Sequence, residues 1–366
     1  MAPSYRALDG RARRAFRRLS LVGPQDVAEW VVAALLDEPD AADVVNLLAD
    51  KSLLTLAGVD AGGEPRYRLH DLLRDFAAER LAEDPEQQRD AALERMLTGY
   101  LQLAGLADRG LPREPTFPPP QRLPAPAVVP DTAAARLTAD PVAWFAAERL
   151  NLLAATRRAC EPGRGQHELA ARLASCQLAF QDYQARFDDA GAGCCQQALA
   201  TAQQFADPVC EYLALSALAK SRSLAGDHTD ATDLAQQALK LMRGIGYSWG
   251  EARCLTLLGS AYHGLGRHRD AIDALARALP VYQRCGARHA QAACLLKLGH
   301  AHQALGHHQQ ATQYLQHSLR ISRELRLNRL ERQALQALQK CRAATGPAPG
   351  STNARPYTGG EACQPR

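Results

Sequence analysis

The 366-residue sequence lacks the motifs that identify most nucleotide-dependent enzymes and membrane proteins. It has no G-x-x-x-x-G-K-[ST] loop, and its Gly62-Gly63 pair precedes a glutamate that would repel phosphate and a proline without an N–H. The sequence contains no run of about 18 apolar residues, which is the length that a membrane span needs, and we expect no signal peptide because no apolar segment lies near Met1. Nucleophile elbows and paired carboxylates at catalytic spacing are also missing. We therefore expect a cytoplasmic protein that is not an enzyme.

Aromatic residues are scarce, at 5%, and the net charge of +4 is small and spread along the chain. Such a charge gives no reason to expect nucleic acid or an anionic membrane as a partner. The ten cysteines never form a C-x-x-C pair, and the histidines between residues 300 and 317 fall around a helix end and a turn. We therefore expect no metal, and we interpret the cysteines as small buried residues in a reducing compartment.

The C-terminal half contains a repeat with a period of 40 residues. A shift of 40 superposes leucines, glycines and alanines, as in the sets Leu218, Leu258 and Leu298; Gly226, Gly266 and Gly306; and Ala231, Ala271 and Ala311. Each copy has the pattern of a helix, a tight turn at the glycine and a second helix. Upstream, a fourth and weaker copy contains Leu178 and Ala198.

The spacing inside each copy resembles the tetratricopeptide repeat, W-x2-L-G-x2-Y followed by A-x3-F. The matching residues are Leu255-x2-Leu258-Gly259-x2-Tyr262 with Ala271-x3-Leu275, and Leu295-x2-Leu298-Gly299-x2-His302 with Ala311-x3-Leu315. The closing proline is replaced by Gln283, and the period exceeds the usual 34, so longer helices are expected. A HEAT-like repeat has a similar length but does not explain the Leu-Gly and Tyr spacing. We predict a mostly α protein with a right-handed α-solenoid over residues 141–344.

Particular residues of the repeats have predicted roles. Gly259 and Gly299, with Ala271 and Ala311, are expected where the two helices of a repeat cross, because larger side chains would hold the axes beyond 8–10 Å. Gly266 and Gly306 are expected to end first helices in the left-handed conformation. The candidate ligand contacts on the first helices are Arg222, Arg253, Tyr262, Lys297 and His302, although Tyr262 is equally compatible with core packing.

Residues 1–85 have the pattern of a winged helix: helices over 11–21, around 27–34 and over 41–51, a hairpin turning at Gly62-Gly63, and a last helix over 70–81. The third helix carries Asp40, Asp43 and Asp50 against Lys51, so direct nucleic-acid binding is not expected. The arginines of the first helix are interpreted as a solvated or interdomain face. A connecting helix is expected over 86–110, an extended Pro-rich linker over 111–140, and a disordered tail over 345–366.

Two short segments suggest a family. Tyr67-Arg68-Leu69-His70-Asp71-Leu72-Leu73-Arg74 resembles the Met-His-Asp-type motif that closes the winged helix of NB-ARC and other STAND signalling ATPases. Trp144-Phe145-x2-Glu148-Arg149-x-Asn151-Leu152 resembles the segment that opens the repeats of actinobacterial AfsR/SARP-type regulators. The Pro-rich stretch lies between them in the same order, so the resemblance extends from about Leu8 to Cys341.

The resemblance implies that this chain is the regulatory protein-interaction part of a STAND-type transcriptional regulator, which would act as a sensor or adaptor. It also implies that the chain lacks the ATPase and DNA-binding domains of such a regulator. In that family the histidine contacts the β-phosphate of ADP, so His70 would be the nucleotide sensor and Asp71 would fix the turn at the helix start. His70 can also be interpreted as a surface histidine at a strand–helix junction. No cofactor is expected, with ADP or ATP present only if another chain supplies an ATPase domain.

The expected partners are a protein, a peptide or a small inducer bound by the repeats, together with a separate STAND ATPase module if the system is split. A fragment, a split-gene product and an autonomous protein are equally compatible with the sequence. The alternative function is that of a winged-helix DNA-binding transcriptional regulator.

Overall fold

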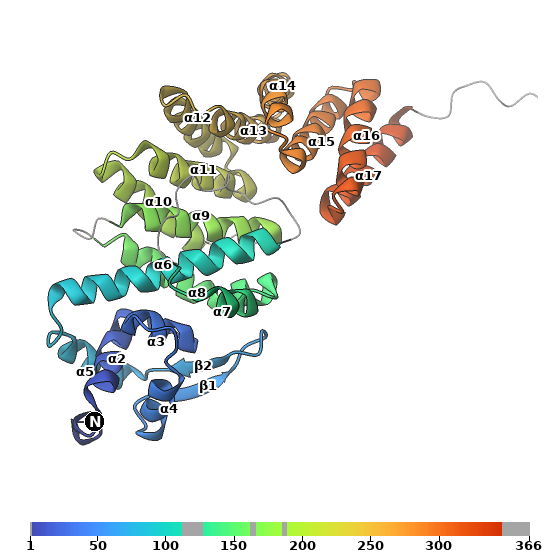
Figure 1. Cartoon of the computed structure of the whole chain (residues 1–366). Coiled ribbons are helices and arrows are strands. Elements are labelled where there is room, and N and C mark those ends of the chain that lie inside the picture. The colour runs from blue at the N-terminus through green and yellow to red at the C-terminus, as the bar shows by residue number, and fades with distance from the viewer. Residues whose placement is uncertain (1, 112–126, 162–165, 185–188, 346–366) are drawn as a thin grey trace, which may run out of the picture.

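The computed structural model describes residues 2–111, 127–161, 166–184 and 189–345, so the predicted tail lies almost wholly outside the described residues. Within these ranges no helix is both long and apolar enough to cross a membrane. Almost all of the regular structure is helical, and from α8 to α17 each helix packs against the next in sequence order (Figure 1).

The N-terminal module has the predicted order of helices followed by a hairpin. Its elements are α1 (Ala2–Arg6), α2 (Gly10–Arg18), the 3-10 helix η1 (Leu19–Leu21), α3 (Glu29–Leu36), α4 (Ala42–Asp50), β1 (Thr55–Val59), β2 (Pro65–Arg68) and α5 (Asp71–Leu81). The two strands are antiparallel, with a bulge between Leu56 and Gly58. Asp60 shapes the turn, because its carboxylate accepts hydrogen bonds from the backbone of Gly62 and Glu64.

A long helix, α6 (Glu86–Gly110), lies between this module and the repeats (Figure 1). It approaches α3 closely, since a Cβ added to Gly99 would lie 2.7 Å from the Trp30 ring. The next residue, Tyr100, is buried, and its ring meets that of Trp30 edge-on at 4.7 Å between centroids. The predicted connecting helix is therefore a packed element of the core.

The predicted extended linker over residues 111–140 contains a helix at its described end. Helix α7 (Asp131–Leu137) begins directly after Pro130, where a proline costs the helix no hydrogen bond. Upstream of it, the Gln102 side chain on α6 accepts from the backbone N–H groups of Val128 and Val129 and donates to the Val129 carbonyl. This part of the linker is thus fastened to α6.

The repeat array is built from paired helices: α8 (Pro141–Ala159), α9 (His167–Gln184), α10 (Asp189–Gln204), α11 (Pro208–Ala225), α12 (His228–Gly244), α13 (Ser248–Gly264), α14 (His268–Arg284), α15 (Arg288–Ala304), α16 (His308–Glu324) and α17 (Asn328–Thr345). From α12 to α16 every helix has 17 residues. Three residues connect each of these helices to the next, so two helices with their two connections span the 40 residues of one repeat. Longer helices therefore account for the extended period, as predicted.

Glycines of two kinds set this geometry. Gly226, Gly266 and Gly306 have φ of 93°, 74° and 76° at the turns after first helices, which confirms the predicted left-handed ends. Gly259 and Gly299 lie inside first helices, where an added Cβ would fall 2.6 Å from Leu275 and Leu315, respectively. The close contact is therefore with the leucine one turn beyond Ala271 or Ala311, and both alanines are fully buried.

The hydrophobic core is continuous across the modules. One cluster extends from Tyr5 in α1 to Leu218 in α11, and it includes residues of α6 and α8. A second cluster joins α11 to α15, and a third joins α15 to α17. The N-terminal module and the first repeats therefore share one core, and the later repeats extend it by contacts between neighbours.

Adding a methyl group at Gly259 tests the crossing geometry. We expect Gly259→Ala to lower the free energy of unfolding by about 1–3 kcal/mol, because the new Cβ overlaps the Leu275 side chain. Gly244→Ala on α12 is the matched control, since a Cβ there meets nothing within 4 Å. Urea denaturation measures both variants. Equal stability of the two would contradict the close contact, and Leu275→Ala in the Gly259→Ala background should recover part of the loss.

Candidate functional site

The first helices of the repeats share one continuous surface. Helix α11 contacts α13, α13 contacts α15, and α15 contacts α17. The acidic residues of these helices are Glu211, Glu251 and Glu331, all near the helix starts. Their lysines and arginines are more numerous: Lys220, Arg222, Arg253, Arg288, Lys297, Arg329, Arg332, Lys340 and Arg342. The surface is therefore positively charged.

Polar and basic side chains lie together where α13, α15 and α17 meet. They are Ser260, His263, Lys297, His300 and Lys340, and we call these five residues the basic surface. Lys297 donates to the Ser260 hydroxyl at 2.6 Å, and the rings of His263 and His300 are 6.5 Å apart. Burial lowers the pKa of His300 to about 4, helped by the nearby His263, Lys297 and Lys340. The charged neighbours of His300 on all three helices are thus basic.

The predicted contact residues are divided between this surface and other places. Lys297 belongs to the basic surface, whereas the half-exposed Arg222 faces Asp227 at the following turn, 3.6 Å away. The guanidinium of Arg253 lies 5.9 Å from the centre of the Trp249 ring on the same helix. Arg222 and Arg253 thus contact residues of their own repeats, whereas Lys297 contacts Ser260 on the neighbouring first helix.

Tyr262 contacts the second helix of the preceding repeat, α12, and His302 contacts the second helix of its own repeat, α16. The Tyr262 hydroxyl accepts from Gln236 at 3.3 Å, and Arg267 lies over its ring at 4.6 Å. His302 is only 8% exposed and stacks on Tyr314 at 5.2 Å, and its pKa is lowered by burial and by His307. For Tyr262 the arrangement matches the alternative of core packing.

Sequence reasoning missed His300 and Lys340 as surface residues. The signal was available in the repeat itself, because residues 220, 260, 300 and 340 occupy equivalent positions and are Lys, Ser, His and Lys. Three of the four are polar groups that carry or can carry a positive charge. A search along this position, which directly follows the pairs Leu258-Gly259 and Leu298-Gly299, would have found the surface.

His70 and Asp71 lie at the start of α5, directly after β2. His70 is the exposed N-cap residue, and its side chain makes no capping hydrogen bond. Asp71 is also exposed and pairs with Arg74 at 2.9 Å, and Arg74 in turn donates to the Leu69 carbonyl at 2.8 Å. Arg74 therefore ties the strand end to the helix, and the imidazole of His70 is accessible from outside the chain.

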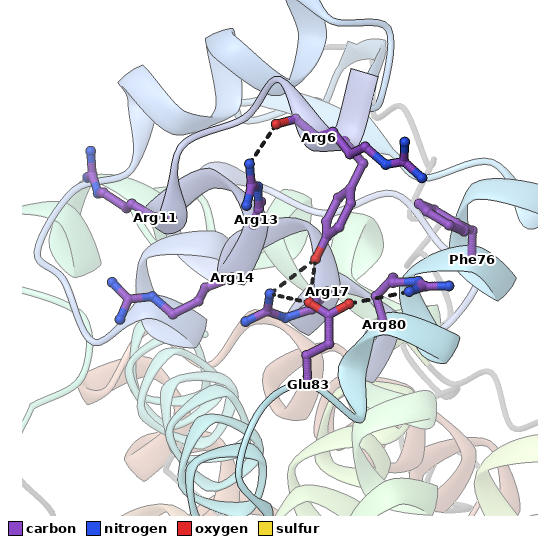
Figure 2. Close-up of a pocket in the computed structure, with 10 residues that line it drawn as sticks. Arg6, Arg11, Arg13, Arg14, Arg17, Phe76, Arg80 and Glu83 are labelled. Carbon is purple, nitrogen blue, oxygen red and sulfur yellow. Dashed lines mark hydrogen bonds and ion pairs between the residues drawn. The ribbon is translucent and has the colours of Figure 1, made fainter. Parts of the chain in front are cut away.

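A cavity of about 660 Å³ opens between α1, α2 and α5. It is lined by six arginines, Arg6, Arg11, Arg13, Arg14, Arg17 and Arg80, with Tyr5, Gly10, Phe76 and Glu83. Arg11 pairs with Glu38 and Asp43, and Arg17 pairs with Glu83 and Asp84, so much of the predicted arginine face serves contacts inside the module. Among the described residues, no carboxylate pairs with Arg6, Arg13 or Arg14, and the guanidiniums of Arg6, Arg11 and Arg14 point apart (Figure 2).

The segment that opens the repeats meets the hairpin strand that leads into the His70-Asp71 motif. Arg66 on β2 and Glu148 on α8 form an ion pair at 2.6 Å, with side chains 6% and 1% exposed. Asn151 donates to Glu148 at 2.7 Å and to the Asp26 carbonyl at 3.0 Å, and Arg66 also donates to that carbonyl. Burial would lower the pKa of Arg66, but the hydrogen bond and charge of Glu148 outweigh it and raise the pKa. The hairpin is thereby fixed to the helix that opens the repeats.

Breaking this ion pair tests how the modules are held together. We expect Glu148→Leu to lower the free energy of unfolding by about 3–5 kcal/mol, because Arg66 loses its most buried counter-charge and keeps only the more exposed carboxylates of Asp26 and Asp60, at 3.3 and 3.7 Å. The double variant Arg66→Met with Glu148→Leu should recover most of the loss. Arg320→Ala, which breaks an exposed pair with Glu324, is the control and should cost at most about 1 kcal/mol. A double variant as unstable as Glu148→Leu would contradict the interpretation.

The lowered pKa of His300 predicts a pH dependence of stability. Its pKa of about 4 in the folded chain lies below the ordinary value of 6.5, so the unfolded chain takes up a proton first as the pH falls. The stability that the neutral His300 contributes is therefore complete above pH 6.5 and is lost as the pH falls toward 4. We expect His300→Gln to reduce the loss of unfolding free energy between pH 7 and pH 4 by about 2 kcal/mol. His317→Gln, an exposed histidine on α16, is the control. Identical pH profiles for both variants and the parent would contradict it.

Comparison with known proteins gives a family for the regular repeats. The tetratricopeptide repeat model matches residues 210–284 and 250–324, which are the pairs from α11 to α16. The regulatory protein AfsR of Streptomyces coelicolor is 39% identical over 107 residues, and that of Streptomyces griseus is 40% identical over 105 residues. Each match covers 27% of this chain and 10% of the relative, so the chain matches about a tenth of these proteins' length.

Among solved structures, a signal transduction ATPase with numerous domains (STAND) from Pyrococcus horikoshii, which has a tetratricopeptide repeat sensor, is 16% identical. The similarity covers 93% of this chain and 55% of that one, with a TM-score of 0.39. Residues 210–324 of this chain thus match the tetratricopeptide repeat by the family model, and over about a quarter of its length the chain is similar to the AfsR regulatory proteins.

Proposed function

We propose that this chain is a regulatory sensor or adaptor whose repeats bind an acidic segment of a protein or peptide. The observation that carries the proposal is the basic surface, where lysines and histidines of α13, α15 and α17 lie together and their charged neighbours are basic. Because the pKa values of His263 and His300 are lowered, the positive charge at neutral pH is that of Lys297 and Lys340, and an acidic partner would balance it. Charge complementarity of this kind speeds association and selects among partners.

The structure of the repeats supports a peptide ligand. Tetratricopeptide arrays present an extended surface made from successive equivalent helices, and such surfaces suit an extended or helical segment. Ser260, His300 and Lys340 repeat at one position of consecutive first helices, so polar contacts can follow the ligand along the array. A small inducer would need an enclosed apolar pocket. The cavity lined by six arginines lies outside the repeats, in the N-terminal module.

The proposed signal leaves through the N-terminal module. The Arg66–Glu148 pair and the shared core attach the hairpin and α5 to the first repeats, so a partner that reorders the array also acts on them. The exposed His70 at the start of α5 can then face a nucleotide held by a separate STAND-type ATPase module. The similarity to AfsR supports a place in a transcriptional regulator, with ADP or ATP belonging to that other module.

A second candidate function is DNA binding through the N-terminal module. The observation in its favour is that Arg6 and Arg14 are exposed, with no carboxylate partner among the described residues. Helix α4, which would enter the major groove in a winged helix, exposes Ala42, Asp43, Asn46 and Asp50 and so offers no cation to a phosphate. A gel shift with salt titration separates the two functions, since DNA binding requires a steep loss of affinity with salt.

The peptide proposal is tested with a fluorescein-labelled decapeptide of glutamates as the probe, measured by fluorescence anisotropy with the full chain. We expect the double variant Lys297→Gln with Lys340→Gln to weaken binding at least tenfold. The matched control, Lys240→Gln with Arg277→Gln, removes two charges from the second helices α12 and α14 and should change affinity less than twofold. Equal losses in both double variants, or no binding by the parent chain, would contradict the proposal.

A further inference from the structure

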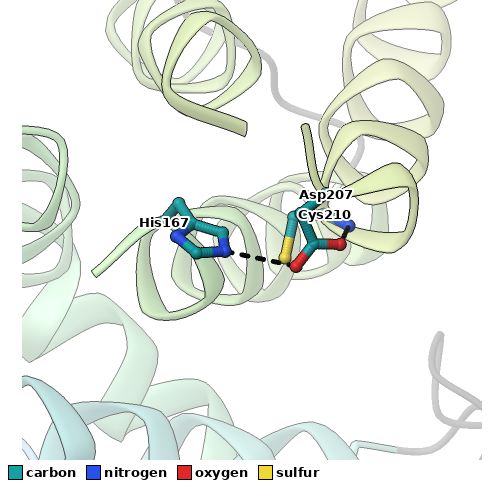
Figure 3. A group of neighbouring side chains, drawn as sticks. All are labelled: His167, Asp207 and Cys210. Atoms are coloured by element: carbon teal, nitrogen blue, oxygen red, sulfur yellow. Dashed lines mark hydrogen bonds and ion pairs between the residues drawn. The ribbon is translucent and has the colours of Figure 1, made fainter. Parts of the chain in front are cut away.

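We propose that His167, Asp207 and Cys210 form a binding site for a zinc-like divalent transition metal at the seam between α9 and α11. The side-chain atoms that could bind a metal, one from each residue, all lie within 4.8 Å of one another. They come from the start of α9 and from the turn and first residues that lead into α11 (Figure 3). The site is separate from the basic surface and does not depend on the proposed function.

Each of the three side chains is already oriented by its surroundings. One carboxylate oxygen of Asp207 accepts from the backbone N–H groups of Val209 and Cys210, both at 3.0 Å, and this fixes the direction of the other oxygen. That second oxygen lies 3.2 Å from Nε2 of His167. The His167 ring stacks on Phe205 with centroids 4.6 Å apart and planes at 17°. Little conformational entropy would therefore be lost when a metal binds.

The distances fit tetrahedral coordination. Nitrogen and oxygen ligands about 2.0–2.1 Å from a tetrahedral zinc ion are about 3.3 Å apart, close to the 3.2 Å between His167 and Asp207. A sulfur at about 2.3 Å from the metal would lie about 3.5 Å from each of them. The Cys210 sulfur is already within 4.8 Å of both atoms, so a small rotation of its side chain completes three ligands.

The donor set selects the class of metal. An imidazole nitrogen, a thiolate and a carboxylate are ligands of zinc and similar transition metals, whereas magnesium and calcium prefer oxygen alone. On binding, the Cys210 thiol releases its proton to solvent and the sulfur forms a bond to the metal. The side chains of His167 and Asp207 are 22% and 30% exposed, so water can reach a fourth position. Glu168, one residue beyond His167, is exposed and paired with Arg172, and it is near enough to influence Cys210.

The repeat explains why these residues meet. His167 and Asp207 are 40 residues apart and so stand at equivalent positions of consecutive repeats, at the starts of their first helices. The next equivalent positions are Tyr247, Ala287 and Leu327, which offer no comparable set of ligands. A metal here would join α9, which packs against α6 in the N-terminal core, to the start of the regular tetratricopeptide repeats. It would hold α9 and α11 together at this one contact of the array.

The test is a titration of the metal-free full chain with Co²⁺, which reports thiolate ligation by a sulfur-to-cobalt charge-transfer band and tetrahedral geometry by intense d–d bands. We expect one cobalt per chain, displaced by Zn²⁺. His167→Gln and Cys210→Ser should each weaken binding at least tenfold, as in other sites that lose a ligand. Cys285→Ser, which removes an exposed cysteine far from the site in sequence, should leave the titration unchanged.

Circular dichroism of each variant shows whether it is folded, and His167→Gln decides the outcome if the buried Cys210 cannot be replaced. Absence of a charge-transfer band in the parent chain would overturn the proposal. A band that survives in folded His167→Gln and disappears in Cys285→Ser would also overturn it, because it would assign the cobalt to the exposed cysteine.

Discussion

A buried ion pair between Arg66 of the hairpin and Glu148 of α8 is the interaction on which the arrangement of the two modules depends. Removing water from a guanidinium and a carboxylate costs several kcal/mol for each ion, so Glu148 stays buried because Arg66 faces it. Arg66 has Glu148 as its closest carboxylate, with those of Asp26 and Asp60 at 3.3 and 3.7 Å. The pair also needs its neighbours in place, since Asn151 and the Asp26 carbonyl occupy the remaining hydrogen-bonding positions. The hairpin and the first helix of the array are therefore held in one relative orientation, which the shared core around α6 reinforces.

From α8 onward the packing is different, because each helix contacts mainly the helices next to it in the sequence. Left-handed glycines end the helices, and glycines without side chains admit Leu275 and Leu315 at the crossings, so each pair repeats the geometry of the last. Regular packing leaves the exposed positions of the first helices free to vary. Here they carry lysine, arginine and histidine beyond the first turn, so the face where the first helices meet is basic.

Much of the array could be predicted from the sequence because its packing is local and periodic. The 40-residue spacing fixed the helix lengths, and Gly266 and Gly259 could be given roles from steric argument alone. Contacts between distant segments could not be predicted. Glu148 was noticed as part of a motif, whereas Arg66 belonged only to the predicted return strand, directly before the other motif. The two residues are 82 positions apart, and only the fold joins them. Tyr262 and His302 were expected to contact a ligand, but the direction of each side chain depends on the second helix beside it. His167 and Cys210 fall outside every short metal-binding spacing for the same reason.

Helix α11 connects these two kinds of packing, because its opposite faces belong to different cores. Ala214, Ala217 and Leu218 are part of the core that contains the N-terminal module. Tyr212, Leu215 and Ala219 are part of the core that continues to α15. In an array stabilised by contacts between neighbours, a change produced at α13 or α15 reaches the N-terminal module through the helices between them. A ligand on the basic surface must therefore act through α11, and a metal held at its first turn would stiffen the segment that transmits the change.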